Sequence, residues 1–130
     1  MTEERFRVKR GASTKKDVIE AVEELKQAIY QSDAKLTVFY CGRDYDIEQL
    51  GKAMVEAFGD QIVVGCTSAG EIGPRGYTAG GLTGVSLASE EISVLTRRLD
   101  NVSAARMGDG QALAEAMLAE VDPSYSGSTD

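Results

Sequence analysis

The segment between residues 36 and 64 constrains the fold more than any other part of the chain. Two runs rich in β-forming residues, 36–40 and 62–64, flank a stretch in which Ile47, Leu50, Met54 and Phe58 recur at helical spacing. Strand, helix and strand in this order predict a parallel βαβ unit with a right-handed crossover. We therefore expect an α/β fold, with a mixed β-sheet that contains this parallel βαβ unit and with helices packed on the sheet.

The residues before this unit predict one more strand and one more helix. Phe6 and Val8 alternate with basic residues, a pattern that favours a short edge strand protected by charge. Thr14 followed three residues later by Asp17 resembles a capping box. Apolar residues at helical spacing follow, so an amphipathic helix is expected over residues 15–31.

The residues after the unit predict a hairpin and a last helix. Apolar residues alternate with small ones over 84–88 and are dense again over 92–96, which favours a β-hairpin. The small residues on one face of its first strand would let a backbone, a helix or a ligand approach closely. An alanine-rich stretch over 109–121 predicts a helix. We expect residues 1–123 to form one ligand-binding domain, itself part of a longer domain, followed by a flexible tail over 124–130.

Length and charge exclude several classes of protein. With 130 residues the chain has room for one ordinary domain. Its net charge of -7 repels phosphate backbones and anionic lipids, which argues against nucleic-acid and membrane partners. No apolar run approaches the roughly 20 residues that cross a bilayer, and the first five residues do not resemble a signal peptide. A cytoplasmic location is therefore expected.

The absence of histidine narrows the possible chemistry. It excludes Ser-His-Asp and Cys-His catalytic arrangements, together with histidine-ligated zinc and haem. Cys41 and Cys66 each end an apolar run and are far apart in sequence, so reduced thiols are expected rather than a disulfide or a thiolate metal site. We expect no cofactor and no metal.

Two segments are candidates for a site because they follow the carboxyl ends of the predicted parallel strands, where open α/β sheets bind ligands. These are residues 41–45 and 65–71. The two glycines of the second segment have phosphate-loop spacing, but Glu71 and Ile72 stand where a phosphate loop has Lys and Ser or Thr. Nucleotide binding is therefore not expected.

The second segment instead offers groups that suit a small zwitterionic or polyol ligand. It provides glycine backbone, two hydroxyls, a thiol and a carboxylate. The candidate ligand-binding residues are Gly65, Cys66, Thr67, Ser68, Ala69, Gly70 and Glu71, with Tyr45 from the first segment. The alternative is a tight turn whose hydroxyls satisfy its own backbone. Tyr45 could equally pack against the hydrophobic core. Cys66 could be a nucleophile or a small buried hydrophobic residue.

The run Val63-Val64-Gly65-Cys66-Thr67-Ser68-Ala69-Gly70-Glu71-Ile72 resembles the signature of the FIST N domain. The order of elements over residues 35–94 is similar as well. The resemblance implies a sensory domain of signal-transduction proteins that binds a small ligand such as an amino acid. It also implies a companion C-terminal domain in the same longer protein.

Three functions follow from these observations. The leading one is ligand sensing without catalysis, in which Glu71 would pair with the ammonium group of an amino-acid-like ligand. The second is a hydrolase-like enzyme that uses Cys66, Thr67 or Ser68 as nucleophile, although no general base is evident. The third is a protein-interaction module, which a large exposed apolar patch would favour.

Overall fold

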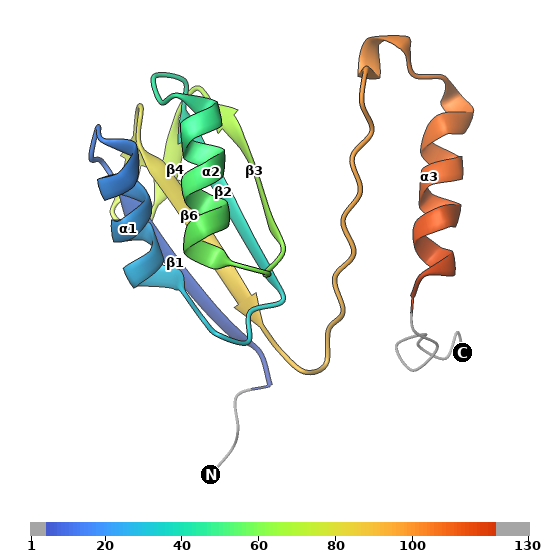
Figure 1. Cartoon of the computed structure of the whole chain (residues 1–130), viewed down its shortest axis with the longest axis horizontal. Coiled ribbons are helices and arrows are strands. Elements are labelled where there is room, and N and C mark those ends of the chain that lie inside the picture. The colour runs from blue at the N-terminus through green and yellow to red at the C-terminus, as the bar shows by residue number, and fades with distance from the viewer. Residues whose placement is uncertain (1–4, 122–130) are drawn as a thin grey trace. The chain divides into compact units, whose positions relative to one another are not determined.

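The computed structural model describes residues 5–121. The chain divides into two compact units, of which the first ends at Glu91 and the second begins at Ile92. The first unit contains, in order, β1 (Arg7–Ser13), α1 (Val18–Ile29), β2 (Leu36–Gly42), α2 (Ile47–Phe58), β3 (Val63–Ser68), β4 (Glu71–Gly73), β5 (Gly76–Thr78) and β6 (Leu82–Ala88) (Figure 1).

Four strands form the main sheet, in the order β1-β6-β2-β3. Strands β2 and β3 are parallel, and β6 runs antiparallel to both of its neighbours. The predicted βαβ unit is therefore confirmed, and so is the mixed α/β sheet. The predicted edge strand is confirmed as β1, which continues from Arg7 as far as Ser13.

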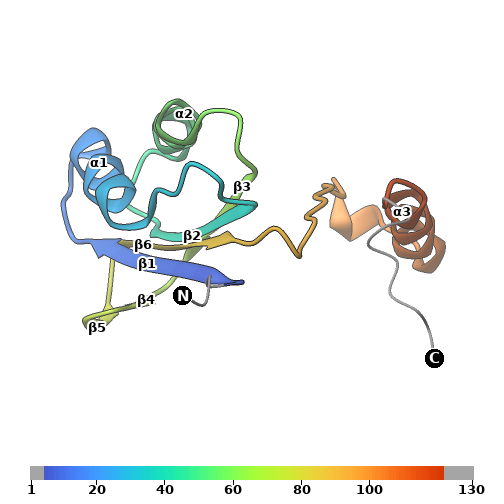
Figure 2. The ribbon, with the colours of Figure 1, turned by 90° about the horizontal axis from the view of Figure 1, so that it is seen from below.

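The first two helices cover one face of this sheet (Figure 2). Helix α1 begins at Val18, because the Asp17 carboxylate accepts a hydrogen bond from the Glu20 backbone N–H over 3.0 Å. The expected start at residue 15, with Thr14 as the cap, is wrong. Helix α2 is capped in the same way by Asp46, which accepts from Gln49 N over 3.1 Å.

The hydrophobic core lies between these helices and the sheet. Its members come from the inward sides of both helices and from the strands below them. They are Val18, Ala21, Val22, Leu25, Ile29, Cys41, Tyr45, Leu50, Ala53, Met54, Phe58 and Leu82. Burial of each large apolar side chain contributes about 1.5–3 kcal/mol, so this single layer stabilises the first unit.

Small residues in the strands let α1 lie close to the sheet. A Cβ atom built on Gly84 would stand 3.2 Å from Leu25 Cδ2 and 3.3 Å from Ile29 Cδ1. On β1, a Cβ atom on Gly11 would meet the Ala28 side chain at 2.5 Å. The expectation that the small face of β6 admits a close neighbour is confirmed, and the neighbour is helix α1.

Among the described residues of the first unit, the β4–β5 hairpin lies on the opposite face of the sheet (Figure 2). Strand β4 contacts β1, β2 and β6 from this side. Much of the remaining face is open, since Val8 and Tyr40 are 51% and 46% exposed.

The hairpin predicted from residues 84–88 and 92–96 is wrong, because residues 92–96 form no strand. Strand β6 already has β1 on one side and β2 on the other, so neither of its edges is free for a following strand. The residues that follow Glu91 are irregular until a short 3-10 turn, Val102–Ala104, and a helix, α3 (Met107–Ala119).

Helix α3 confirms the last predicted helix, two residues earlier than expected at each end. None of its residues is buried. The expected tail over 124–130 lies outside the described residues. Within residues 5–121, no helix is both long and apolar enough to cross a bilayer.

Candidate functional site

The carboxylate of Glu71 lies at the carboxyl ends of β2 and β3, the edge where the site was predicted. Its side chain is only 2% exposed. One oxygen accepts a hydrogen bond from the backbone N–H of Gly81 over 2.7 Å, and the other accepts from Ser68 Oγ over 2.8 Å. Glu71 therefore connects the end of β3 to the residues that lead into β6.

Two further polar groups are buried near Glu71. The Cys41 thiol is 1% exposed, and its sulfur lies 3.7 Å from the backbone oxygen of Cys66. Burial raises the pKa of Cys41, with smaller contributions from Cys66 and Glu71. Tyr45 is 6% exposed and donates its hydroxyl to the backbone oxygen of Lys15. Burial also raises the pKa of Tyr45, helped by Cys41, Glu71 and Glu24.

The residues before Glu71 belong mostly to a strand, which corrects the prediction of a loop from residue 65. Gly65, Cys66, Thr67 and Ser68 lie in β3, and only Ala69 and Gly70 form the turn. The side chains of Cys66 and Thr67 are exposed. Cys66 was expected as a nucleophile or a buried hydrophobe, and the second alternative is wrong.

The two glycines of this segment make room for aromatic rings of the protein itself. The Phe39 ring fills the place where a side chain on Gly65 would lie. The Tyr77 ring and hydroxyl do the same at Gly70. These contacts account for both glycines without a ligand.

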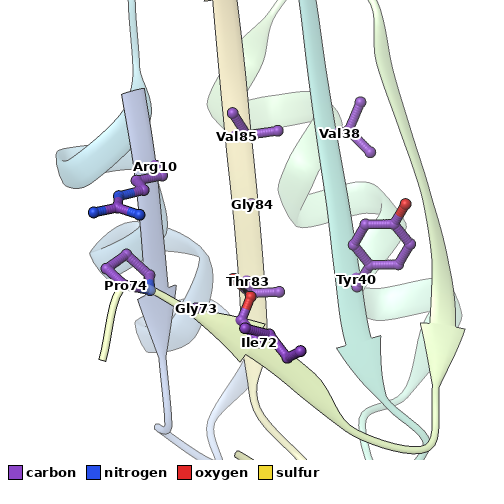
Figure 3. A pocket seen from close by; sticks show the side chains of 9 residues that line it. All are labelled: Arg10, Val38, Tyr40, Ile72, Gly73, Pro74, Thr83, Gly84 and Val85. Carbon is purple, nitrogen blue, oxygen red and sulfur yellow. Dashed lines mark hydrogen bonds between the residues drawn. The ribbon is translucent and has the colours of Figure 1, made fainter. Parts of the chain in front are cut away.

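A separate pocket of about 300 Å³ lies on the open face of the sheet, beside the β4 strand. It is lined by Arg10 from β1, by Val38 and Tyr40 from β2, by Thr83, Gly84 and Val85 from β6, and by Ile72, Gly73 and Pro74 (Figure 3). Arg10 and Pro74 lie at one side of the pocket, and Val38 and Tyr40 lie at the other. The lining is mainly apolar, and Arg10 is its one charged residue.

None of the eight predicted site residues lines this pocket. The structure brings Ser68 and Glu71 together, and places Tyr45 within electrostatic reach of Glu71. Cys66 is the register partner of Tyr40, which lines the pocket, and so lies on the same face of the sheet. Because side chains alternate between the two faces of a strand, the sequence over 36–40 could have placed Val38 and Tyr40 on the same face of the sheet. Nothing local could have brought Arg10 beside them, because that depends on pairing between β1 and β6.

Comparison with known proteins identifies the family. The sequence matches the FIST N domain over residues 35–129, which is more than half of the chain. This chain belongs to the FIST N domain family. The resemblance noted in the sequence is thereby confirmed. FIST N domains are sensory domains of signal-transduction proteins.

Other comparisons add little to this assignment. No curated protein matches the chain. Among solved structures, CetZ from Methanosaeta thermophila strain DSM 6194 is similar, with 11% sequence identity and a TM-score of 0.41. The alignment covers 88% of this FIST N chain and 33% of CetZ, so the chain spans about a third of that protein. With a TM-score this low, the similarity to CetZ supports no conclusion about function.

Proposed function

We propose that this FIST N domain is a sensory input domain that binds a small metabolite, an amino acid or a similar compound, without transforming it. Membership in a family of sensory domains supports the sensory role. The observation that carries the proposal is the mainly apolar pocket of about 300 Å³ with one charged residue. That volume is at the lower end of the range for small-molecule sites.

We propose that this pocket and the predicted site have different roles in ligand binding. The pocket receives the apolar part of the ligand, while Cys66, exposed on the same face of the sheet, approaches the ligand from β3. Glu71 and Tyr45 are buried and hydrogen-bonded, so they position the edge of the sheet at the carboxyl ends of β2 and β3. Recognition of an ammonium group by Glu71 stays a prediction. It requires the ammonium group to replace Ser68 Oγ as the hydrogen-bond donor to Glu71.

One contact in the structure supports the hydrolase alternative, but the chain still lacks an evident general base. Ser68 Oγ lies 2.8 Å from a Glu71 oxygen, as a nucleophile would lie from its base. The other Glu71 oxygen is held by Gly81 N, and the chain has no histidine to relay a proton. A carboxylate is a weak base for a serine hydroxyl, because the two ordinary pKa values differ widely. We therefore propose sensing rather than catalysis.

The open sheet face favours a second candidate function, a protein-interaction surface. Large apolar side chains on this side of the unit are well exposed, among them Val8, Tyr40, Ile72 and Tyr77. Exposed apolar patches mark interaction sites, and these side chains are candidates for one. A companion C-terminal domain of the same longer protein is the partner that we propose, and ligand occupancy beside it would then alter how the two domains associate.

A thermal-shift screen of amino acids and related metabolites tests the sensing proposal. A ligand at a hundred times its dissociation constant adds about 2.7 kcal/mol of stability. For a unit of this size, that raises Tm by roughly 10–20 °C. We expect Tyr40→Ala to abolish the shift, each variant being compared with its own unliganded Tm. Tyr30→Ala is the matched control, since Tyr30 is 42% exposed and lies outside the pocket. A screen in which no compound raises Tm would contradict the proposal.

A further inference from the structure

The side chain of Arg10 is directed to the open face of the sheet by the alternation of β1. Its neighbour Gly11 faces α1, where a Cβ atom would meet Ala28 and Ile29. Successive residues of a strand point to opposite faces, so Arg10 points away from the helices. It pairs in register with Val85 of β6, which also lines the pocket.

Arg10 differs from other arginines near it in having no acidic partner. Arg5 lies 3.6 Å from Glu91, and Arg7 forms an ion pair with Asp33. Within residues 5–121, no carboxylate lies at ion-pair distance from Arg10. A guanidinium group presents a planar pair of donors that matches a carboxylate in bidentate geometry. The pocket therefore has an unused anchor for an anionic group.

The other side of the pocket is apolar. Val38, Val85 and the ring of Tyr40 form this part of the lining, and no Asp or Glu is among the pocket residues. An ammonium group placed here would lose water without gaining a charged partner, which is unfavourable. The lining thus favours a ligand with a negative end and an apolar body, and disfavours a zwitterion.

The strand order sets the length of such a ligand. Arg10 and Tyr40 come from β1 and β2, with β6 between them. Adjacent strands are about 4.8 Å apart, so the two backbones are separated by roughly 10 Å. A carboxylate joined by one or two carbons to a ring or branched chain can bridge this separation, because the hydrogen bond to Arg10 and the contact with Tyr40 cover part of it.

We propose that the Arg10 pocket binds a monocarboxylate with an aromatic or branched apolar body and no ammonium group. This inference rests on the proposed sensory function and narrows its ligand, from an amino acid or a similar compound, to a carboxylic acid that lacks the amino group. The carboxylate pairs with Arg10, and the apolar body lies over Val38 and Val85 against Tyr40. The amino group that distinguishes an amino acid from the corresponding simple acid then weakens binding.

The test compares phenylacetate with two probes that each differ from it by one group: the neutral phenylacetamide, and 2-phenylglycine, which adds an ammonium group. Binding to the whole chain is measured by calorimetry and by thermal shift. We expect phenylacetate to bind at least tenfold more tightly than either of the other two, a difference of about 1.4 kcal/mol. Arg10→Gln should weaken phenylacetate binding tenfold or more, and Arg10→Lys should weaken it less. Lys9→Gln removes the same charge from the adjacent, oppositely directed position and should change little.

Each contrary outcome has a definite meaning. Binding of 2-phenylglycine as tight as that of phenylacetate overturns the exclusion of the ammonium group. Equal binding of phenylacetate to Arg10→Gln and to the unaltered chain overturns the role of Arg10. If the chain responds to another class of metabolite but to none of these probes, the ligand class is wrong while the sensory function stands. If it responds to no compound at all, both proposals fail.

Discussion

Replacement of Glu71 by Gln tests whether this carboxylate holds the sheet edge together or recognises a ligand. Its two oxygens accept bonds of 2.7 and 2.8 Å from Gly81 N and Ser68 Oγ, in a side chain that is 2% exposed. Hydrogen bonds to a charged group contribute about 1.5–3 kcal/mol and neutral ones about 0.5–1.5 kcal/mol. The amide can keep both contacts as neutral bonds, so the difference amounts to about 1 kcal/mol for each bond.

We therefore expect Glu71→Gln to lower the free energy of unfolding by about 2 kcal/mol, which lowers Tm by roughly 8–16 °C. Glu71→Ala should lower the free energy of unfolding further, because it leaves the buried N–H of Gly81 without a hydrogen-bond partner. Urea unfolding followed by circular dichroism measures both variants. Glu90→Gln is the control, since Glu90 is exposed, and its effect should stay within about 0.5 kcal/mol.

A double-mutant cycle makes the test more specific. Ser68→Ala removes one of the two donors, so its effect and that of Glu71→Gln should not add. The reasoning is refuted if Glu71→Gln leaves stability within about 0.5 kcal/mol of the unaltered chain and weakens ligand binding tenfold. That pattern would instead assign Glu71 to the recognition of an ammonium group.

Two other predictions concern buried polar groups of the first unit, Thr37 and Cys41. Thr37→Val should raise the free energy of unfolding by about 1–3 kcal/mol, because the Thr37 hydroxyl is fully buried and has no hydrogen-bond partner among the described residues. A loss of stability on urea unfolding would show instead that the hydroxyl is bonded to a buried water. Stability should also decrease as the pH rises above 9.0, the ordinary pKa of a thiol, because the raised pKa of Cys41 favours the protonated thiol in the folded state. Unfolding at pH 7 and pH 10 should show a smaller loss for Cys41→Ala than for the unaltered chain, and equal losses would contradict this.

The local pattern of the chain was sufficient to predict its helices and its parallel strands. Helix α2 and the strands on either side of it follow from apolar spacing over residues 36–64, and each cap is a nearby Asp. These features depend on residues a few positions apart. The boundary of α1 was misplaced because Thr14 and Asp17 are both good capping residues, and only the backbone geometry chooses Asp17.

Features that depend on distant residues could not be predicted in the same way. The hairpin after β6 was wrong because the true partners of β6 are residues 7–13 and 36–41. The pocket was missed for the same reason, since Arg10 meets Val85 only through that pairing. Glu71 was correctly singled out as unusual, but the sequence could not show that Ser68 and Gly81 already occupy its oxygens.

The position of β6 in the sheet also determines the order in which the first unit can assemble. This strand is the last of the unit to leave the ribosome, yet it lies between β1 and β2. Until residues 82–88 have been synthesised, β2 and β3 can pair around α2, but β1 has no strand beside it. Closure then joins residues more than 70 positions apart, such as Gly11 and Gly84, and long-range pairings of this kind form slowly. The nascent chain consequently presents one bare edge of β2 during synthesis, and this interval is when aggregation or capture by a chaperone would compete with folding.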